Sequence, residues 1–307
     1  MRPPCELVQK EYLPLVRAKV AQLLHDQDLS QTEIASKLDI TQAAVSKYLR
    51  EADPPKSNQL QVKRISERIA HRLLSPSYRP SEILYELCSA CMLSRVSSEI
   101  CQRHTTIVPI LAENNCQICS DLLSGRNTIF TSRTKIVQDM HQALKLIEES
   151  VVFPNFMPEV RPNLVVCEDS STTPQDVLAV PGRISLVHGK ARALMQPQFG
   201  ASQHTAEILL WAKETWRYPR ACLSLRGQDD LVQTADTSGF NVVVLDNACI
   251  EASEIIKQAK EFEVNTDSHL AISVPGGIGI EPILYTFGPS AVSLVKRVIT
   301  MADFLEK

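Results

Sequence analysis

Residues 221–245 read ACLSLRGQDDLVQTADTSGFNVVVL, and this stretch decides the fold class of the second half of the chain. Its apolar beginning, 221–225, predicts a buried strand, and residues 241–245 predict another. Between them, residues 229–238 have the amphipathic spacing of a helix. Strand, helix and strand in direct succession, punctuated by glycine, are typical of an α/β domain.

The same alternation continues on both sides of this stretch. The distribution of glycine also changes along the chain, because all ten glycines lie at or after Gly125. We therefore expect an α/β domain over residues 151–307. Further strands are predicted at 183–188, 191–196, 269–274 and 282–287, and further helices at 204–217, 251–261 and 289–304.

The first half of the chain predicts helices only. Residues 11–52 indicate three short helices, and an amphipathic helix is expected from about Ser132 to Glu149. Between them lie a basic segment, 56–79, and a cysteine cluster. The predicted organisation is an all-α domain at 1–55, a helical, cysteine-rich middle segment at 56–150 and the α/β domain at 151–307.

Residues 30–50 predict two helices joined by a tight turn. Ser30 and Glu33 form a capping box ahead of the first helix, Thr41 caps the second, and small Ala35 allows their close approach. The segment resembles the helix-turn-helix of many prokaryotic regulators, whose second helix enters the major groove. Gln and Arg can read base edges there, and hydroxyls at helix starts suit phosphates. The candidate contacts to double-stranded operator DNA are Gln31, Thr32, Thr41, Gln42, Ala43, Ser46, Lys47 and Arg50.

The charge of this region leaves an alternative open. Residues 11–51 carry five basic and six acidic side chains, so non-specific affinity for DNA should be low. A small three-helix bundle that binds protein, or nothing, fits the same pattern. The basic segment 56–79 either supplies phosphate contacts or is a solvated helix face.

Two C-x-x-C pairs define the cysteine cluster. We expect Cys88, Cys91, Cys116 and Cys119 to form a tetrahedral zinc site, and an iron–sulfur cluster is the second possibility. Cys101 and His104 lie between the pairs and exceed the four ligands that zinc needs. The alternative is that Cys88 and Cys91 lie on one helix face with Leu84 and Leu87 and are buried there as small hydrophobic side chains.

Composition excludes several classes of protein. The net charge of -3 and the hydrophobic content of 44% exclude a disordered chain and a strongly basic coat protein. No run of 18 or more apolar residues exists, so no membrane helix is expected. The start, Met1-Arg2-Pro3-Pro4, lacks the apolar core of a secretory signal, and a cytoplasmic chain without a membrane partner is expected.

Five stretches of the second half carry a family resemblance. They are MPEVRPNL (157–164), VPGRI (180–184), FGASQH (199–204), Arg226 after a strand, and GGIGIEP (276–282). They resemble, in this order, the ThiN-type archaeal thiamine-phosphate synthase domain, which joins a pyrimidine diphosphate to a thiazole phosphate. A helix-turn-helix joined to such a domain resembles the archaeal regulators of thiamine biosynthesis called ThiR. The resemblance implies that Arg183 and His204 are the arginine and histidine implicated in the synthases.

The same residues suit a phosphorylated ligand on physical grounds. Small residues before a helix expose N–H groups to a phosphate, and arginines can bind it bidentately. The glycine run is either an anion-binding nest or an ordinary turn, and a lone His204 is also common at a helix start. The candidate ligand contacts are Arg183, Phe199, Gly200, Ala201, Ser202, His204, Arg226, Gly276, Gly277 and Gly279.

One departure from the synthases decides our interpretation. Their charged positions around the glycine run are here the neutral residues Val274, Pro275 and Ile280. Loss of these charges harms catalysis more than binding, because leaving-group charge develops in the transition state. We therefore expect no catalytic residue, and a homodimeric regulator with thiamine phosphate or thiamine diphosphate as effector. Open alternatives are an active synthase, in which Arg183 and His204 act, and a sensor of another phosphorylated metabolite.

Overall fold

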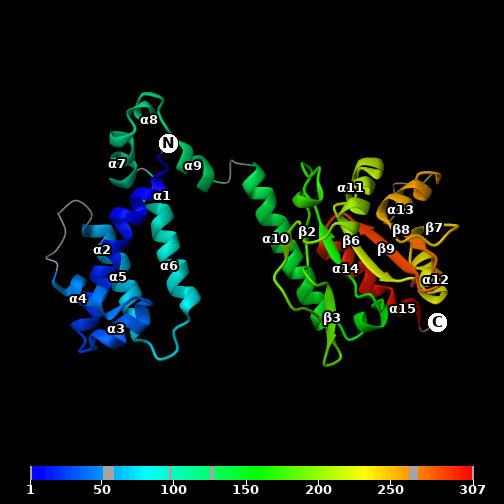
Figure 1. Ribbon diagram of the computed structural model, residues 1–307, viewed down its shortest axis with the longest axis horizontal. Helices are drawn as coiled ribbons and strands as arrows, with labels where there is room; N and C mark the ends of the chain where they lie inside the picture. Colours follow the sequence, from blue (N-terminus) through cyan, green and yellow to red (C-terminus); the bar gives the residue numbers. More distant parts are fainter. Residues whose placement is uncertain (1, 51–58, 97–98, 125–127, 263–268, 306–307) are drawn as a thin grey trace. The chain divides into compact units, whose positions relative to one another are not determined.

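The structure, a computed structural model, describes residues 2–50, 59–96, 99–124, 128–262 and 269–305 (Figure 1). The chain forms two compact units, Met1–Asn127 and Thr128–Lys307. The first unit is helical and the second is α/β. None of the described helices is both long enough and apolar enough to cross a membrane.

The second unit is built on a seven-stranded sheet with the strand order β5-β2-β1-β6-β9-β8-β7. Only β7 and β8 pair in parallel, and the other neighbours are antiparallel. Two further strands, β3 and β4, form a separate hairpin. The strands are β1 Leu164–Val166, β2 Leu178–Ala179, β3 Ile184–Val187, β4 Lys190–Ala193, β5 Gln198–Phe199, β6 Ala221–Arg226, β7 Phe240–Val244, β8 His269–Val274 and β9 Ile283–Gly288.

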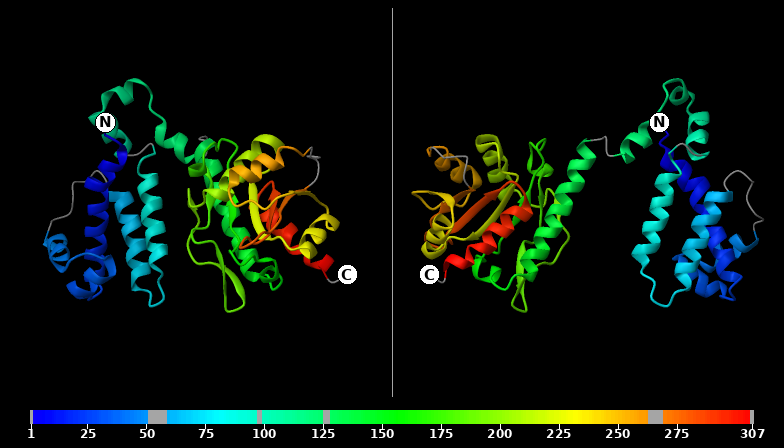
Figure 2. Two further views of the ribbon diagram at one scale, coloured as in Figure 1. Left: turned by 45° about the vertical axis from the view of Figure 1, so that its right-hand side comes forward. Right: turned by 180° about the vertical axis from the view of Figure 1, so that it is seen from behind.

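Helices cover both faces of this sheet (Figure 2). Strand β6 shows the arrangement, since Leu223 and Leu225 face one apolar core and Cys222 faces the other. The first core is closed by α10 Thr128–Glu149, α12 Asp229–Thr237 and α14 Ala291–Thr300, and the second by α11 His204–Trp216 and α13 Ala252–Ala259. Short helices complete the unit: η3 Phe153–Phe156, η4 Pro174–Asp176 and α15 Ala302–Leu305.

The elements of the α/β unit lie close to their predicted ranges, with three differences. Strands β1, β2 and β5 were not predicted, because two or three residues are too short for a periodic pattern. The helix predicted at 289–304 is interrupted at Met301 into α14 and α15. Helix α10, assigned from the sequence to the middle segment, packs on α14 and β4, so the compact unit begins at Thr128 rather than after Ser150.

The helical unit has its own apolar core. Val20 and Leu24 of one helix meet Ile34, Val45 and Ile69 from three others. The helix α2, predicted from about residue 11, is preceded by further helical turns from Pro4 on. The helices are α1 Pro4–Leu7, η1 Val8–Tyr12, α2 Leu13–His25, α3 Gln31–Leu38, α4 Gln42–Arg50, α5 Gln59–Leu74, α6 Pro80–Leu93, α7 Glu99–Ile107, α8 Pro109–Glu113 and α9 Ile118–Leu123.

Candidate ligand site and candidate nucleic-acid interface

Arg183, His204 and Tyr285 come together in the α/β unit. His204 opens α11, and its Nε2 lies 2.9 Å from the hydroxyl oxygen of Tyr285 in β9. Burial lowers the pKa of His204, and the charge of Arg183 lowers it further, whereas Glu251 and Glu207 raise it. Burial raises the pKa of Tyr285, against the effect of the Arg183 charge. The cluster therefore combines a neutral imidazole, a protonated phenol and a permanent cation.

A tight turn positions Arg183. The Arg183 N–H donates to the carbonyl of Val180 at 3.2 Å, and the Pro-Gly pair between them occupies the turn, with Gly182 at φ +71°. Arg183 itself has φ +65°, an uncommon conformation for a residue with a side chain. The exposed guanidinium donates to the carbonyl of Val160 at 2.6 Å. This contact leaves other N–H groups of the guanidinium to bind an anion.

Glu281 also holds the backbone segment 159–160. Its carboxylate accepts the N–H groups of Glu159 and Val160 at 2.8 and 3.1 Å. Segment 159–160 is thus held by Arg183 through a carbonyl and by Glu281 through two N–H groups. The family-like stretches around 160, 183 and 281 therefore converge in the structure, as the resemblance implies.

The glycine run forms the turn that the sequence left as an alternative to an anion nest. Gly277 and Ile280 exchange two backbone hydrogen bonds of 3.0 Å, and Gly279 has φ +72°. The N–H of Gly277 is therefore engaged within the turn. A Cβ at Gly276 would lie 2.8 Å from Cδ of Pro282, so glycine is needed there for close packing.

Phe199 to Ser202 lead into α11 as predicted. Gly200 has φ +75°, and its N–H donates to the carbonyl of Val177 at 3.0 Å, so this group too is engaged. The side chain of Gln203 turns to Glu207 and does not cap the helix. The first N–H groups of α11 therefore need a hydrogen-bond partner other than the Gln203 side chain. Ala201 and Ser202 are half-buried beside them.

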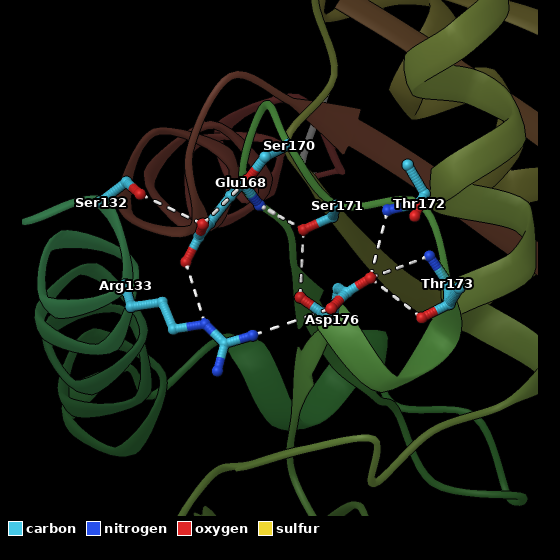
Figure 3. A network of polar contacts seen from close by, with 8 residues as sticks. All are labelled: Ser132, Arg133, Glu168, Ser170, Ser171, Thr172, Thr173 and Asp176. Atoms are coloured by element: carbon cyan, nitrogen blue, oxygen red, sulfur yellow. Dashed lines mark hydrogen bonds and ion pairs between the residues drawn. The ribbon is translucent and has the colours of Figure 1, made fainter. Parts of the chain in front are cut away.

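Arg133 takes part in an ionic network with Glu168 and Asp176 (Figure 3). The guanidinium of Arg133, near the start of α10, stacks over the Phe199 ring at 4.4 Å from its centroid. The same group pairs with Glu168 at 3.5 Å and with Asp176 at 3.7 Å. Hydrogen bonds, above all from Thr173, lower the pKa of Asp176. The network links the start of α10 to segment 168–176, between β1 and β2, and to Phe199 of β5.

Arg226, also predicted as a ligand contact, has different partners. Its two terminal nitrogens each lie 2.7 Å from a carboxylate oxygen of Asp230, and its Nε donates to the carbonyl of Asn155 at 2.6 Å. The Asp230 carboxylate raises the pKa of Arg226. The guanidinium is thus already neutralised by a bidentate pair, and binding of a phosphate there would have to displace Asp230.

Sequence reasoning missed Tyr285 within the cluster and two polar residues beside it. Ser224 is the cross-strand neighbour of Tyr285, and its Oγ accepts the N–H of Asn163 at 2.9 Å. Among the described residues, Asn163 Oδ1 is one of few buried side-chain oxygens without a hydrogen-bond partner. Tyr285 and Ser224 lie inside apolar strands and read as core residues. Only Asn163 lies within a stretch that carried the family resemblance.

A hollow of about 840 Å³ is lined by α12 and by Gly276, a predicted ligand contact, and its acidic side chains are unsuited to phosphate. Carboxylates of Asp229 and Asp236 line it, and neither Arg183 nor His204 does. Negative side chains repel an anionic ligand. The cluster of Arg183, His204 and Tyr285 is therefore the better candidate ligand site.

The predicted turn between α3 and α4 is present in the helical unit. Ser30 N–H donates to Glu33 at 2.8 Å, Glu33 N–H returns to Ser30 Oγ at 3.3 Å, and Ala44 N–H donates to Thr41 Oγ1 at 3.2 Å. Asp39 takes the left-handed conformation that ends α3. Of the predicted DNA contacts, Thr32, Thr41, Gln42, Ala43, Lys47 and Arg50 are exposed, and Gln31 and Ser46 are half-buried. Their contact with DNA stays a prediction.

The basic side chains of α5 are largely paired within the unit. Arg68 and Arg72 both contact the buried carboxylate of Glu86, and Arg72 also pairs with Glu82 at 3.2 Å. Lys63 pairs with Glu67 at 3.9 Å. These contacts favour a structural role over phosphate binding for this part of 56–79. Lys56 lies outside the described residues.

The structure does not bring the two C-x-x-C pairs together as a ligand set. Among the described residues, no three side chains of His, Cys, Asp or Glu lie close enough to hold a metal ion. Cys88 is exposed on α6, whereas Cys91 accepts a hydrogen bond of 3.1 Å from Arg95. Cys116 and Cys119 line a hollow together with Cys101 and His104.

Comparison with known proteins identifies the α/β unit. A family model described as thiamine-phosphate synthase ThiN matches residues 139–300, slightly more than half of the chain. The thiamine-phosphate synthase ThiN of Methanothermobacter thermautotrophicus is 28% identical over 171 residues, which cover 53% of this chain and 90% of that protein. The solved C-terminal domain of phosphomethylpyrimidine kinase has 22% identity and a TM-score of 0.47, with 55% of this chain and 99% of that domain covered. The chain belongs to the thiamine-phosphate synthase ThiN family.

Proposed function

We propose that this protein is a DNA-binding regulator of thiamine biosynthesis genes and that its ThiN-like domain senses a thiamine phosphate. The observation that carries the proposal is the combination of two features. Arg183 and His204, to which the family resemblance points, lie near enough that the Arg183 charge lowers the pKa of His204, and the same chain presents a polar face on α4, preceded by a capped helix and a turn.

The ligand part of the proposal rests on charge. The permanent cation of Arg183 and the first N–H groups of α11 suit a phosphate. The neutral imidazole of His204 and the phenol of Tyr285 offer polar contacts without a net charge. Thiamine phosphate or thiamine diphosphate carries such an anionic group. Val274, Pro275 and Ile280 supply no charge for a leaving diphosphate, which favours binding over catalysis.

The DNA part rests on the exposed face of α4. Gln42 and Arg50 can read base edges, and Ala43 can contact a thymine methyl. A homodimer would place two such helices on two half-sites, and ligand binding would change their spacing. Affinity for the effector and affinity for the operator would then be reciprocally coupled.

A binding assay on the promoters of thiamine genes tests this function. We expect the full-length protein to prefer these promoters over unrelated DNA of equal length, and thiamine phosphate or diphosphate to change that affinity by roughly 5- to 150-fold. No preference for any thiamine promoter would refute the regulator. A preserved preference without response to either effector would leave a regulator that senses another phosphorylated metabolite, which a thermal-shift panel would identify.

An active synthase is the second candidate, and the contact between His204 and Tyr285 beside Arg183 favours it. Incubating the pure protein with the pyrimidine diphosphate and the thiazole phosphate decides between the two. We expect no product at ordinary enzyme rates. Product at such rates would show that the domain catalyses despite its neutral 274–280 stretch.

A further inference from the structure

Three polar side chains form a row across the sheet on the face that α11 covers. Asn163, directly before β1, is opposite Ser224 of β6, and the Ser224 N–H donates to the carbonyl of Asn163 at 3.2 Å. Ser224 is in turn the register partner of Tyr285 in β9. Residues opposite each other on antiparallel strands have their side chains on one face of the sheet. Tyr285 belongs to the core that α11 closes, so the row lies on that face.

The row is the border between the apolar core and the rim of the sheet. One step deeper on the same face, the register partners Val165 and Cys222 are fully buried in the core. One step outward, Arg226 and Ile283 are register partners and only half-buried. Asn163 lies between these levels and is 6% exposed. A molecule bound at the rim can therefore contact the row without entering the core.

Only one of the three side chains has an oxygen without a partner. The Tyr285 hydroxyl is engaged by the imidazole described above, and Ser224 Oγ accepts the N–H of Asn163 at 2.9 Å. Asn163 Oδ1 is buried and accepts no hydrogen bond from the described residues. The other oxygen of this kind in the described part of the chain, Glu168 Oε1, lies 3.5 Å from Nε of Arg133. The oxygen of Asn163 has no such cation beside it.

The fold does not need this oxygen. The backbone of Asn163 already makes the local contacts, since its N–H donates to Ser224 Oγ and its carbonyl accepts the Ser224 N–H. A buried acceptor without a donor costs free energy, and an apolar side chain at the same position would avoid that cost. The amide oxygen therefore points to a donor that does not belong to the described chain.

The row also lies next to the groups that suit a phosphate. The N–H of Ile184, which follows Arg183, donates to the carbonyl of Pro162, which precedes Asn163, at 2.9 Å. The turn that carries Arg183 is thus adjacent to Asn163, and Tyr285 lies on the other side, two strand spacings or about 10 Å away. A single phosphate is too small to contact Asn163 and the imidazole beside Tyr285 together. A ligand that contacts both has a second polar group in addition to its phosphate.

We propose that Asn163 determines the specificity of the ligand site by accepting, at Oδ1, a hydrogen bond from an amino group on a heteroaromatic ring of the ligand. This ring is joined to the phosphate that Arg183 binds. An asparagine amide pairs well with an amino group next to a ring nitrogen, as it does with adenine. Thiamine phosphates contain such a ring, an aminopyrimidine. The inference rests on the proposed function for the phosphate and adds the group by which the rest of the ligand is recognised.

Titration calorimetry of the full-length protein with three compounds tests the proposal. Thiamine phosphate and hydroxymethylpyrimidine phosphate carry both the amino group and a phosphate, whereas thiazole phosphate carries only the phosphate. Asn163→Leu should lower the affinity for the first two by roughly 5- to 150-fold, because the amino group loses its acceptor. The affinity for thiazole phosphate should not change. An equal loss for all three compounds, or no loss for any, would overturn the proposal.

Thermal unfolding separates this role from a structural one. Asn163→Leu should leave the melting temperature unchanged or raise it, because the lost oxygen has no partner in the fold. Thr286→Val is the matched control: Thr286 is fully buried on the opposite face of β9, and its Oγ1 donates to the carbonyl of Leu223 at 3.0 Å. This variant should melt at a lower temperature and keep its affinity for thiamine phosphate. A lower melting temperature in Asn163→Leu with unchanged affinity would make Asn163 a structural residue.

A smaller variant guards against a clash of the leucine side chain. Asn163→Ala removes the same oxygen and should show the same selective loss of affinity for the two aminopyrimidine phosphates. Full affinity in Asn163→Ala would refute the hydrogen bond even if Asn163→Leu does not fold.

The same titrations distinguish this inference from the proposed function. Binding of hydroxymethylpyrimidine phosphate but not of thiamine phosphate, with a loss in Asn163→Leu, would support the role of Asn163 and show that the proposed effector is wrong. Binding of neither aminopyrimidine phosphate by the unaltered protein would refute the role of Asn163. The preference for thiamine promoters, measured without any ligand, would then still decide whether the protein is a regulator.

Discussion

Nε2 of His204 lies 2.9 Å from the hydroxyl oxygen of Tyr285, which joins the start of α11 to strand β9. Burial raises the pKa of the tyrosine, so its hydroxyl keeps its proton. The phenol can donate to Nε2 or accept from it, according to the tautomer of the imidazole. In both cases Nε2 is engaged by Tyr285, so Nδ1 is the ring nitrogen that remains for a ligand.

Tyr285→Phe should weaken ligand binding. The change removes the hydroxyl and releases Nε2 of the imidazole, at a cost of about 0.5–1.5 kcal/mol, which corresponds to a roughly 2- to 10-fold lower affinity. Isothermal titration with thiamine phosphate measures this. Tyr218→Phe is the control, because Tyr218 also makes two hydrogen bonds, to Phe287 and Leu270, but its role is in the core. Equal affinity losses in both variants would contradict the role of Tyr285.

The stability of the α/β unit should depend on pH through His204. Its pKa in the folded protein is below the ordinary value of 6.5, because burial and the Arg183 charge disfavour the imidazolium. As pH falls from about 7 to about 5, the unfolded chain takes up a proton before the folded chain does, so the free energy of unfolding decreases. His204→Gln should remove this part of the decrease, measured by denaturant unfolding across the range. The exposed His188→Asn is the control, and an unchanged pH dependence in His204→Gln would contradict the expectation.

The sequence predicted the α/β unit where its elements are long. Strands β6, β8 and β9 and helices α11 and α12 have enough residues to show a period. Strands β1, β2 and β5 are too short to show a period. They are strands because they pair with neighbouring strands. The place of α10 was also beyond sequence reasoning, because an amphipathic helix shows that it packs but not against which unit.

The residues of the candidate site were likewise predicted only in part. Arg183 and His204 were predicted through the family resemblance, and the charge of Arg183 lowers the pKa of His204 in the structure. Tyr285 was missed, because an aromatic residue in an apolar strand is usually core. Gly276 and Gly277 were assigned to an anion nest or a turn, and only coordinates distinguish the two, since both need glycine.

Arg183→Gln should lower the affinity for a thiamine phosphate. Hydrogen bonds to a charged group contribute about 1.5–3 kcal/mol, so we expect a loss of about 10- to 100-fold. Arg192→Gln is the matched control, because Arg192 lies on the same hairpin and pairs with Glu148 at 2.9 Å. Titration calorimetry compares the three proteins. An affinity that falls equally in both variants would mean that only the overall charge matters.

Asp139 should stabilise the α/β unit from α10. Its carboxylate accepts the N–H groups of Ala291 and Val292 at 2.6 and 3.2 Å and so caps the start of α14. Asp139→Ala should reduce the free energy of unfolding by about 0.5–2 kcal/mol, as for other lost helix caps. Glu149→Ala on the same helix removes only an exposed pair with Lys145 and should change it by less than about 0.5 kcal/mol. Similar values for both would contradict the assignment of α10 to this unit.

Substitutions on α4 should separate sequence reading from general attraction to DNA. Gln42→Ala should reduce binding to a cognate thiamine promoter by about 1–3 kcal/mol and leave unrelated DNA unchanged, because base contacts carry specificity. Lys47→Gln should weaken both and lower the slope of log affinity against log salt by about 0.9, because one phosphate contact is lost. Lys145→Gln, a charge change on α10 in the other unit, controls for net charge and should leave the slope unaltered. Fluorescence anisotropy at several salt concentrations measures all three, and a slope that falls as much in Lys145→Gln as in Lys47→Gln would remove α4 from the proposed interface.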